Sequence, residues 1–288
     1  MVDITYESFE SGVTELHFAA WRDFVNFIHE VMATQPEFIW RGQRVQSWPL
    51  QPGFERDLVA MGLEPDSIEA DKLRFEHLQR FKLAARGRLD PRDFEERELL
   101  VERDDTRDDV PIGSSAAERE ENNWWAVGQH YGLRTPLLDW STSPFVAAYF
   151  AFNALSPADN KEGRALYALN RELVSQKADE LRQDDPEYKV PVVDFIEPLY
   201  KDNPRLVSQG GLFTRSPNGL DVSAWIEEHY EEEDEDYGAW LLKLVLPDED
   251  REYILQMLNR MNINHQSLFP DLYGVTEFVN MKLTLKNY

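Results

Sequence analysis

The chain has 288 residues and no cysteine, and its 54 acidic residues outnumber 30 basic ones, which gives a formal charge of −24. This length can bury a core without disulfides or metals, and the lack of cysteine excludes thiolate metal sites and cysteine nucleophiles and favours a cytoplasmic location. The negative field repels DNA, RNA and anionic lipid, so we expect no direct nucleic-acid binding. The longest apolar run, residues 145–152, is far shorter than the roughly 20 residues of a transmembrane helix, so we expect no membrane span.

Apolar periodicity predicts most of the regular structure in chain order. Trp21, Phe24 and Ile28 fall at steps of three and four, as in an amphipathic helix, whereas the prolines of 47–56 indicate an ordered loop without regular structure. Ser143 and Pro144 form an N-cap signal before the most apolar segment. The pattern predicts helices over residues 19–33, 66–86, 144–155, 171–183, 248–261 and about 272–279, a helix ending near Gly132, and strands over residues 38–40, 137–140, 165–169 and 240–246.

Three further segments complete the architecture. A glycine pair between apolar residues in 204–214 predicts a strand, a tight turn and a second strand. The acidic segments 89–121 and 227–236 are expected to be exposed insertions, the second a solvated loop or a helix end. With no internal repeat, residues 1–288 are predicted to form a single α+β domain, with a core over about 19–280, a mixed or antiparallel central sheet and helical additions.

Polar chemistry is concentrated in residues 129–152, beside the apolar helix. His130 suits a general base or a ribose-binding group, although a histidine at a helix end is also a common cap. Asp139 lies between Leu138 and Trp140, so its carboxylate is expected to have an arginine partner, Arg41 or Arg134, or a shifted pKa. A structural ion pair and a catalytic role are both open.

The residues around Asp139 offer ligand contacts of several kinds. Ser141 and Thr142 carry hydroxyl groups near the N-terminal amides of the following helix, where an anionic group can be held, while Ser143 serves as the cap. Trp140 is the best candidate to stack on a ring. No Gly-x-Ser-x-Gly elbow surrounds Ser141, so we do not expect it to be a hydrolase nucleophile. No HExxH, Walker A, GxGxxG or EF-hand pattern is present, so neither a metal site nor a Rossmann fold is predicted.

Two arginines outside this stretch complete the candidate site. Arg41 follows a buried strand and precedes a glycine, which would let its guanidinium bind a phosphate in a cleft or pair with a carboxylate. Arg205 and Gln209, four positions apart, are expected to line the same cleft from a later strand.

The motifs in combination resemble the FRG domain family, which takes its name from an aromatic-Arg-Gly motif. The resemblance covers about residues 19–280, and the chain reads Arg134-Thr135-Pro136 where family members usually read Pro-Thr-Arg. The motifs that carry the resemblance are Phe38-Ile39-Trp40-Arg41-Gly42-Gln43, His130-Tyr131-Gly132, Leu137-Leu138-Asp139-Trp140-Ser141 with Pro144, Arg205 with Gln209-Gly210 and Phe213-Thr214, and Leu268-Phe269-Pro270-Asp271-Leu272.

The resemblance implies a fold and an activity. The motif order is similar to that of ADP-ribosyltransferases, in which the aromatic-Arg-Gly strand holds the phosphate or ribose of NAD and a Ser-Thr-Ser strand end supports the nicotinamide ribose. Their Glu-x-Glu has no counterpart here, where Arg205 and Gln209 stand, and Asp139 or Glu277 is the available substitute. In the resemblance, Arg41-Gly42 and Ser141-Thr142-Ser143 match the first two of these positions. Together with the chemistry of the individual residues, it predicts catalysis by Asp139, His130 and Ser141, and NAD binding by Arg41, Gln43, Trp140, Thr142, Arg205 and Gln209.

Two functions from different classes follow. The first is an ADP-ribosyltransferase or NAD glycohydrolase that binds NAD or a related nucleotide, modifies a small molecule or protein target, and acts in conflict between prokaryotes and phages, for example as a toxin or in phage defence. The alternative is a non-catalytic acidic interaction protein. With its charge of −24, such a protein would mimic nucleic acid or bind and inhibit a basic partner.

Overall fold

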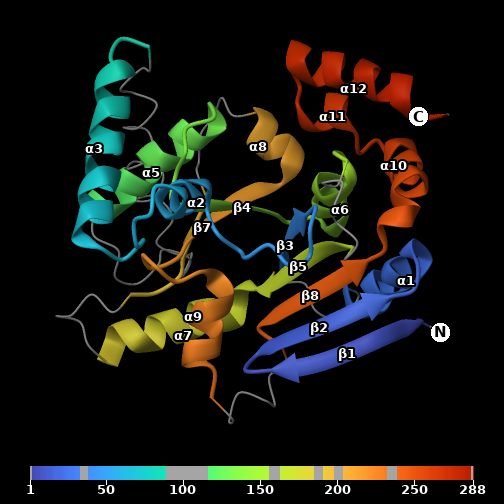
Figure 1. Cartoon of the computed structure of the whole chain (residues 1–288), viewed down its shortest axis with the longest axis horizontal. Coiled ribbons are helices and arrows are strands. Elements are labelled where there is room, and N and C mark those ends of the chain that lie inside the picture. The colour runs from blue at the N-terminus through green and yellow to red at the C-terminus, as the bar shows by residue number, and fades with distance from the viewer. Residues whose placement is uncertain are drawn as a thin grey trace, which may run out of the picture.

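One curled, mixed sheet of eight strands crosses the molecule, in the order β1-β2-β8-β5-β3-β4-β7-β6 (Figure 1). The computed structural model describes residues 2–32, 38–88, 116–155, 163–184, 191–197, 204–231, 239–286 and 288. Strands β2 and β8 pair in parallel, and the other neighbouring strands are antiparallel. The strands are β1 Ile4–Glu10, β2 Val13–Phe18, β3 Phe38–Gln43, β4 Leu137–Ser141, β5 Arg164–Asn170, β6 Asp194–Ile196, β7 Gly211–Arg215 and β8 Leu241–Leu246.

Helices cover both faces of the sheet and add a layer beside strands β4 and β7. This arrangement confirms the predicted single α+β domain with a mixed sheet and helical additions. The helices are α1 Trp21–Met32, α2 Gly53–Ala60, α3 Ile68–Ala84, α5 Ala116–His130, α6 Pro144–Phe152, α7 Arg171–Asp184, α8 Pro204–Gln209, α9 Val222–His229, the 3₁₀ turn η2 Asp248–Asp250, α10 Arg251–Arg260, α11 His265–Leu268 and α12 Leu272–Thr284.

The two faces of the sheet bury different sets of side chains because successive residues of a strand point to opposite sides. On one face, Phe38 and Trp40 pack with α1, α6 and α10. On the other, Ile39, Tyr167 and Leu169 pack with α7 and α9. In Figure 1, α6 and α10 to α12 lie toward the upper right, and α7 and α9 lie at the lower left.

Helix α6 is the central packing element of the first face. Its N-cap is Ser143, whose hydroxyl oxygen accepts the amide of Val146 at 3.3 Å, as the Ser-Pro signal predicts. Its C-terminal carbonyl groups are bound by two arginines. Arg164, which is fully buried, donates to the carbonyl oxygens of Ala151 and Ala154, and Arg251 donates to those of Phe152 and Asn153. These cations satisfy carbonyl groups that a helix end leaves open.

Gly42 brings strand β3 against α6. A Cβ atom at this position would lie 1.9 Å from the carbonyl oxygen of Ala147 and 2.7 Å from the amide nitrogen of Ala151. The absence of a side chain therefore allows the strand and the helix backbone to touch, which the sequence could indicate only as a close approach.

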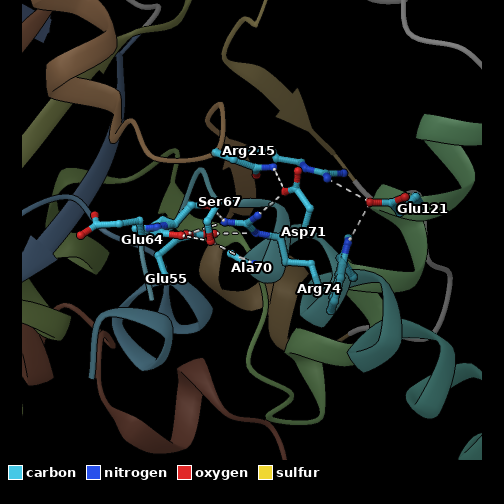
Figure 2. A network of polar contacts seen from close by, with 11 residues as sticks. Glu55, Glu64, Ser67, Ala70, Asp71, Arg74, Glu121 and Arg215 are labelled. Atoms are coloured by element: carbon cyan, nitrogen blue, oxygen red, sulfur yellow. Dashed lines mark hydrogen bonds and ion pairs between the residues drawn. The ribbon is translucent and has the colours of Figure 1, made fainter. Parts of the chain in front are cut away.

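A polar network fixes α2 and α3 beside the sheet (Figure 2). Arg74 and Glu55, both buried, form two hydrogen bonds of 3.1 and 2.9 Å, and Arg74 also bonds Asp71 at 2.7 Å. In the same view, Arg215 of β7 pairs with Glu121 of α5 at 2.9 Å. Buried charges need partners of this kind, so the network holds α2 in a defined position.

The fold corrects two sequence predictions and contains one hairpin that the sequence did not predict. Residues 53–60 form helix α2, which begins directly after Pro52, so the segment 47–56 is not wholly irregular. Residues 204–209 form helix α8, and only the residues after Gly210 continue as a strand. The sequence also gave no indication of the β1–β2 hairpin, whose β2 pairs with β8 in the main sheet.

The acidic segments are described only in part. Residues 89–115 and 232–238 lie outside the described residues. Residues 116–121 form the beginning of α5, where Arg119 and Glu120 are exposed and Glu121 pairs with Arg215 of β7. Residues 227–229 are the last residues of α9, so the described beginning of the segment 227–236 is a helix end, one of the two structures expected for it.

Candidate functional site

Strands β3 and β4 are neighbours in the sheet but separate after one residue pair. Trp40 and Ser141 form the one pair that joins them, while β3 continues along β5 as far as Gln43 and β4 continues along β7 back to Leu137. The guanidinium of Arg41 lies at this separation, where its Nη1 donates to the backbone carbonyl oxygen of Asp139 at 2.8 Å. A side chain thus supplies the hydrogen bond that a paired strand would have supplied.

A cleft of about 790 Å³ lies at this separation. Its walls include four successive residues of β3, whose side chains alternate between the two faces of the strand. The loop before α2, the end of α5, and helices α6 and α8 also contribute. The volume is within the range of about 300 to 1,000 Å³ that is usual for small-molecule sites. The size and the mixed polar and aromatic walls are suited to a nucleotide-sized ligand.

Eight of the nine site residues that the sequence suggests line this one cleft. Thr142 is exposed and does not line it, although its backbone amide bonds the carbonyl oxygen of Gly210 at 2.8 Å. Glu277, on α12, does not line the cleft either. The eight residues that the fold brings together are Arg41, Gln43, His130, Asp139, Trp140, Ser141, Arg205 and Gln209.

The cleft concentrates positive charge in a strongly acidic chain. Five arginines line it, and Asp139 is the one carboxylate residue in its described lining. Sequence reasoning missed three of the arginines as cleft residues, because nothing in the local sequence shows that the loop after β3, α2 and the end of α5 converge. The arginines are Arg41, Arg44, Arg56, Arg134 and Arg205.

Arg41 is the most enclosed of these cations. Its side chain is 18% exposed, and its Nη1 lies 3.9 Å from Oδ2 of Asp139, at the limit of an ion pair. Burial lowers the pKa of Arg41 from its ordinary value, partly offset by the charge of Asp139. An arginine remains protonated nonetheless, so the cleft holds a buried positive charge with weak compensation, which favours an anionic ligand.

Asp139 is more exposed than the sequence suggests. Its side chain is 63% exposed, because its position in β4 faces the cleft rather than the core, so the expected close pairing is reduced to the 3.9 Å contact with Arg41. Arg134, the alternative partner, pairs instead with Asp57 at 3.3 Å. The carboxylate is therefore accessible to a ligand.

His130 is the last residue of α5 and lines the cleft. Burial lowers its pKa from the ordinary value, and the charge of Arg205 lowers it further, while Asp271 acts in the opposite sense. The imidazole is therefore neutral at pH 7 and has a nitrogen available to accept a proton.

Ser141 and Trp140 are held by internal hydrogen bonds. The hydroxyl of Ser141 donates to the carbonyl oxygen of Gln209 at 2.6 Å and accepts the amide of Ser143 at 3.0 Å. The ring of Trp140 is 3% exposed, and its indole nitrogen donates to Thr214 at 2.9 Å. Both residues line the cleft with these polar groups already bonded within the protein. The amide of Val146 at the beginning of α6 is likewise bonded to Ser143.

Arg205 and Gln209 approach the cleft from helix α8 rather than from a strand, which corrects the prediction. Arg205 pairs with Asp271 and lies over the ring of Phe269 at 5.4 Å. Gln209 donates to the carbonyl oxygen of Leu268 at 3.1 Å. The Leu-Phe-Pro-Asp motif therefore joins α11 and α12 to the cleft through α8.

Other classes of site receive no support within the described residues. No group of three or more His, Asp or Glu residues is placed there to hold a metal ion. None of the helices in the described ranges has both the length and the hydropathy needed to cross a bilayer.

The geometry defines an α+β protein with an arginine-lined cleft at a separation between two strands. The family model described as the FRG domain matches residues 36–160, so the chain carries an FRG domain over this range. The match includes β3, β4 and α6, and hence Arg41, His130, Asp139 and Ser141. Comparison with curated proteins found no match, and neither did comparison with solved structures.

Proposed function

We propose that the protein is a nucleotide-binding enzyme similar to ADP-ribosyltransferases, with NAD as its substrate. The observation that carries this proposal is the cleft itself, in which five arginines and one carboxylate residue gather within a chain of net charge −24. Arginine recognises phosphate through its planar set of donors, so a pyrophosphate-bearing ligand matches the charge of the cleft.

The arginines lie on several sides of the cleft, as an extended anion requires. Arg41 is on β3, Arg56 on α2 and Arg205 on α8. Two of the cleft arginines also lie over aromatic rings, Arg44 over Trp48 and Arg205 over Phe269, each at 5.4 Å. These flat surfaces offer places for the rings of a dinucleotide beside its phosphates.

The proposed reaction breaks the bond between C1′ of the ribose and the nicotinamide nitrogen. The electron pair of this bond leaves with nicotinamide, and an oxygen of water or of an acceptor group forms the new bond to C1′ and releases its proton to a base. Asp139, which is accessible, would stabilise the positive charge that develops on the ribose. His130, neutral at pH 7, would accept the proton.

Binding and turnover test the proposal separately. Calorimetric titration with NAD and ADP-ribose measures binding, and chromatography of NAD after incubation, with and without candidate acceptors, measures release of nicotinamide. Asp139→Asn should retain binding and lose turnover. No binding to the wild-type protein would overturn the proposal, whereas binding without turnover under any condition would restrict it to a nucleotide-binding module.

The alternative, a non-catalytic acidic partner of a basic protein, depends on net charge rather than on the cleft. Neutralising the acidic residues of 227–236 discriminates the two functions. The enzyme should keep its NAD binding, whereas an acidic interaction protein should lose its basic partner in a pull-down. A role in conflict between prokaryotes and phages is part of the same proposal, and loss of a protective or toxic phenotype in Asp139→Asn cells would support it.

A further inference from the structure

Strand β3 leaves polar atoms without partners at the wall of the cleft. Nε of Arg41 and Oε1 of Gln43 are both buried and have no hydrogen-bond partner among the described residues. Both residues line the cleft, and Gln43 is only 6% exposed. A buried polar group without a partner destabilises the fold, so these two atoms, on residues that line the cleft, call for a ligand that satisfies them.

The orientation of the Gln43 amide is fixed by its other end. Its Nε2 donates to the carbonyl oxygen of Pro49 at 3.2 Å. A carbonyl oxygen can only accept, so the amide cannot be reversed without losing this bond. Oε1 is therefore the atom of this amide that is left without a partner, and a partner for it must be a hydrogen-bond donor.

Arg41 and Gln43 are two positions apart in a strand and therefore lie on the same side of β3. Their backbone positions are about 7 Å apart, given a rise of about 3.3 Å per residue. A ribose hydroxyl is separated from its own 5′-phosphate by the sugar ring and one further carbon, which suits this short spacing. The amino group of a purine lies at the far end of the nucleotide and does not suit it.

We propose that Arg41 and Gln43 form a ribose 5-phosphate subsite, in which Arg41 binds the phosphate and Oε1 of Gln43 accepts a hydrogen bond from a ribose hydroxyl. This inference rests on the proposed nucleotide-binding function and adds the group that Gln43 selects. Oε1 of Gln43 would favour ribonucleotides over deoxy analogues, because only a ribonucleotide has the ribose hydroxyl that donates to this oxygen.

The test uses the full chain and measures affinities for AMP, 2′-deoxy-AMP and 3′-deoxy-AMP, with nicotinamide mononucleotide as a second ribose 5-phosphate. The wild-type protein should bind one of the two deoxy analogues more weakly than AMP, by roughly three- to tenfold, the effect of one net hydrogen bond. In Gln43→Met this preference should disappear, with AMP reduced to the affinity of that analogue.

Two variants control for folding and position. Gln43→Glu keeps an acceptor, so it should keep the preference for the hydroxyl while binding all the nucleotides more weakly. Gln46→Met removes another amide with a buried, unpartnered oxygen, but Gln46 does not line the cleft, so the preference should be unchanged. Thermal melting checks that each variant is folded.

The outcomes separate this inference from the proposed function. Equal binding of AMP and both deoxy analogues to the wild-type protein would overturn the subsite while leaving nucleotide binding intact. A preference that persists in Gln43→Met would also overturn it, because another group would then read the hydroxyl. If NAD, ADP-ribose, AMP and nicotinamide mononucleotide all fail to bind, the proposed function and the subsite are both wrong.

Discussion

Nη1 of Arg41 donates to the backbone carbonyl oxygen of Asp139 at 2.8 Å, across the point where β3 and β4 cease to pair. One side chain therefore bridges two strands and places its positive charge in the cleft between them. The bridge uses one edge of the guanidinium and leaves Nε without a partner among the described residues.

Replacing Arg41 by lysine tests whether the planar guanidinium, rather than its charge alone, binds the ligand. Arg41→Lys keeps the charge but loses the planar donor set, so affinity for ADP-ribose should fall by roughly 10-fold or more, the value of a hydrogen bond to a charged group. Calorimetry measures the change. Arg80→Lys is the matched control, because Arg80 pairs with Glu76 on the exposed face of α3 and does not line the cleft. Equal affinities in the two variants would contradict the role of Arg41.

Gly42→Ala should destabilise the fold through the contact between β3 and α6. The added Cβ would lie 1.9 Å from the carbonyl oxygen of Ala147, and the strand and helix must separate to admit it. We expect a loss of about 3 kcal/mol or more in the free energy of unfolding, measured with urea, at the upper end for an overpacked core. Gly62→Ala, at φ +77° with nothing within 4 Å, should show only backbone strain of about 1 to 2 kcal/mol. Equal losses would show that the close approach is unimportant.

Arg74→Met should be more damaging than its position outside the cleft suggests. The substitution leaves the carboxylate of Glu55 buried without its two hydrogen bonds, and breaking a buried pair in this way costs roughly 3 to 5 kcal/mol. Urea unfolding measures the loss. The double variant Arg74→Met with Glu55→Leu should recover much of it, and a double variant no more stable than the single one would contradict the explanation.

The lowered pKa of His130 predicts a pH dependence of stability. In the folded chain, burial and the charge of Arg205 disfavour the imidazolium, whereas in the unfolded chain His130 has its ordinary pKa of about 6.5. As the pH falls from about 6.5 to the lowered pKa, the unfolded chain binds a proton that the folded chain does not. The free energy of unfolding therefore decreases over this pH range. His130→Gln should reduce the slope of unfolding free energy against pH between 7 and 5.5.

The pKa of the His130 imidazole should also respond to the charge of its neighbour Arg205. Arg205→Gln removes a positive charge from beside His130 and frees Asp271 to act on it, so the pKa of His130 should rise, as an NMR titration of the imidazole would show. Arg80→Gln should leave that titration unchanged. A pKa that does not move in Arg205→Gln would show that burial alone is responsible.

Local signals predicted the elements that depend on local chemistry. The Ser143-Pro144 cap of α6 and the apolar strands β5 and β8 form where the sequence places them, since a cap and a short apolar run are both patterns of neighbouring residues. Segments with competing signals were assigned wrongly. Prolines concealed the beginning of α2, and the glycines after α8 were taken for a hairpin turn, although they end a helix.

The sequence by itself determined the fold class, the resemblance to FRG domains and the residues worth testing, because periodicity, caps and motifs are properties of nearby positions. Only the tertiary structure decided that β3 and β4 separate after Trp40 and Ser141, that Arg44, Arg56 and Arg134 join Arg41 in one cleft, and that Gln43, in the lining of this cleft, keeps a buried oxygen without a partner among the described residues. Strand pairing and the convergence of loops depend on contacts between residues far apart in the chain, and no local pattern records them.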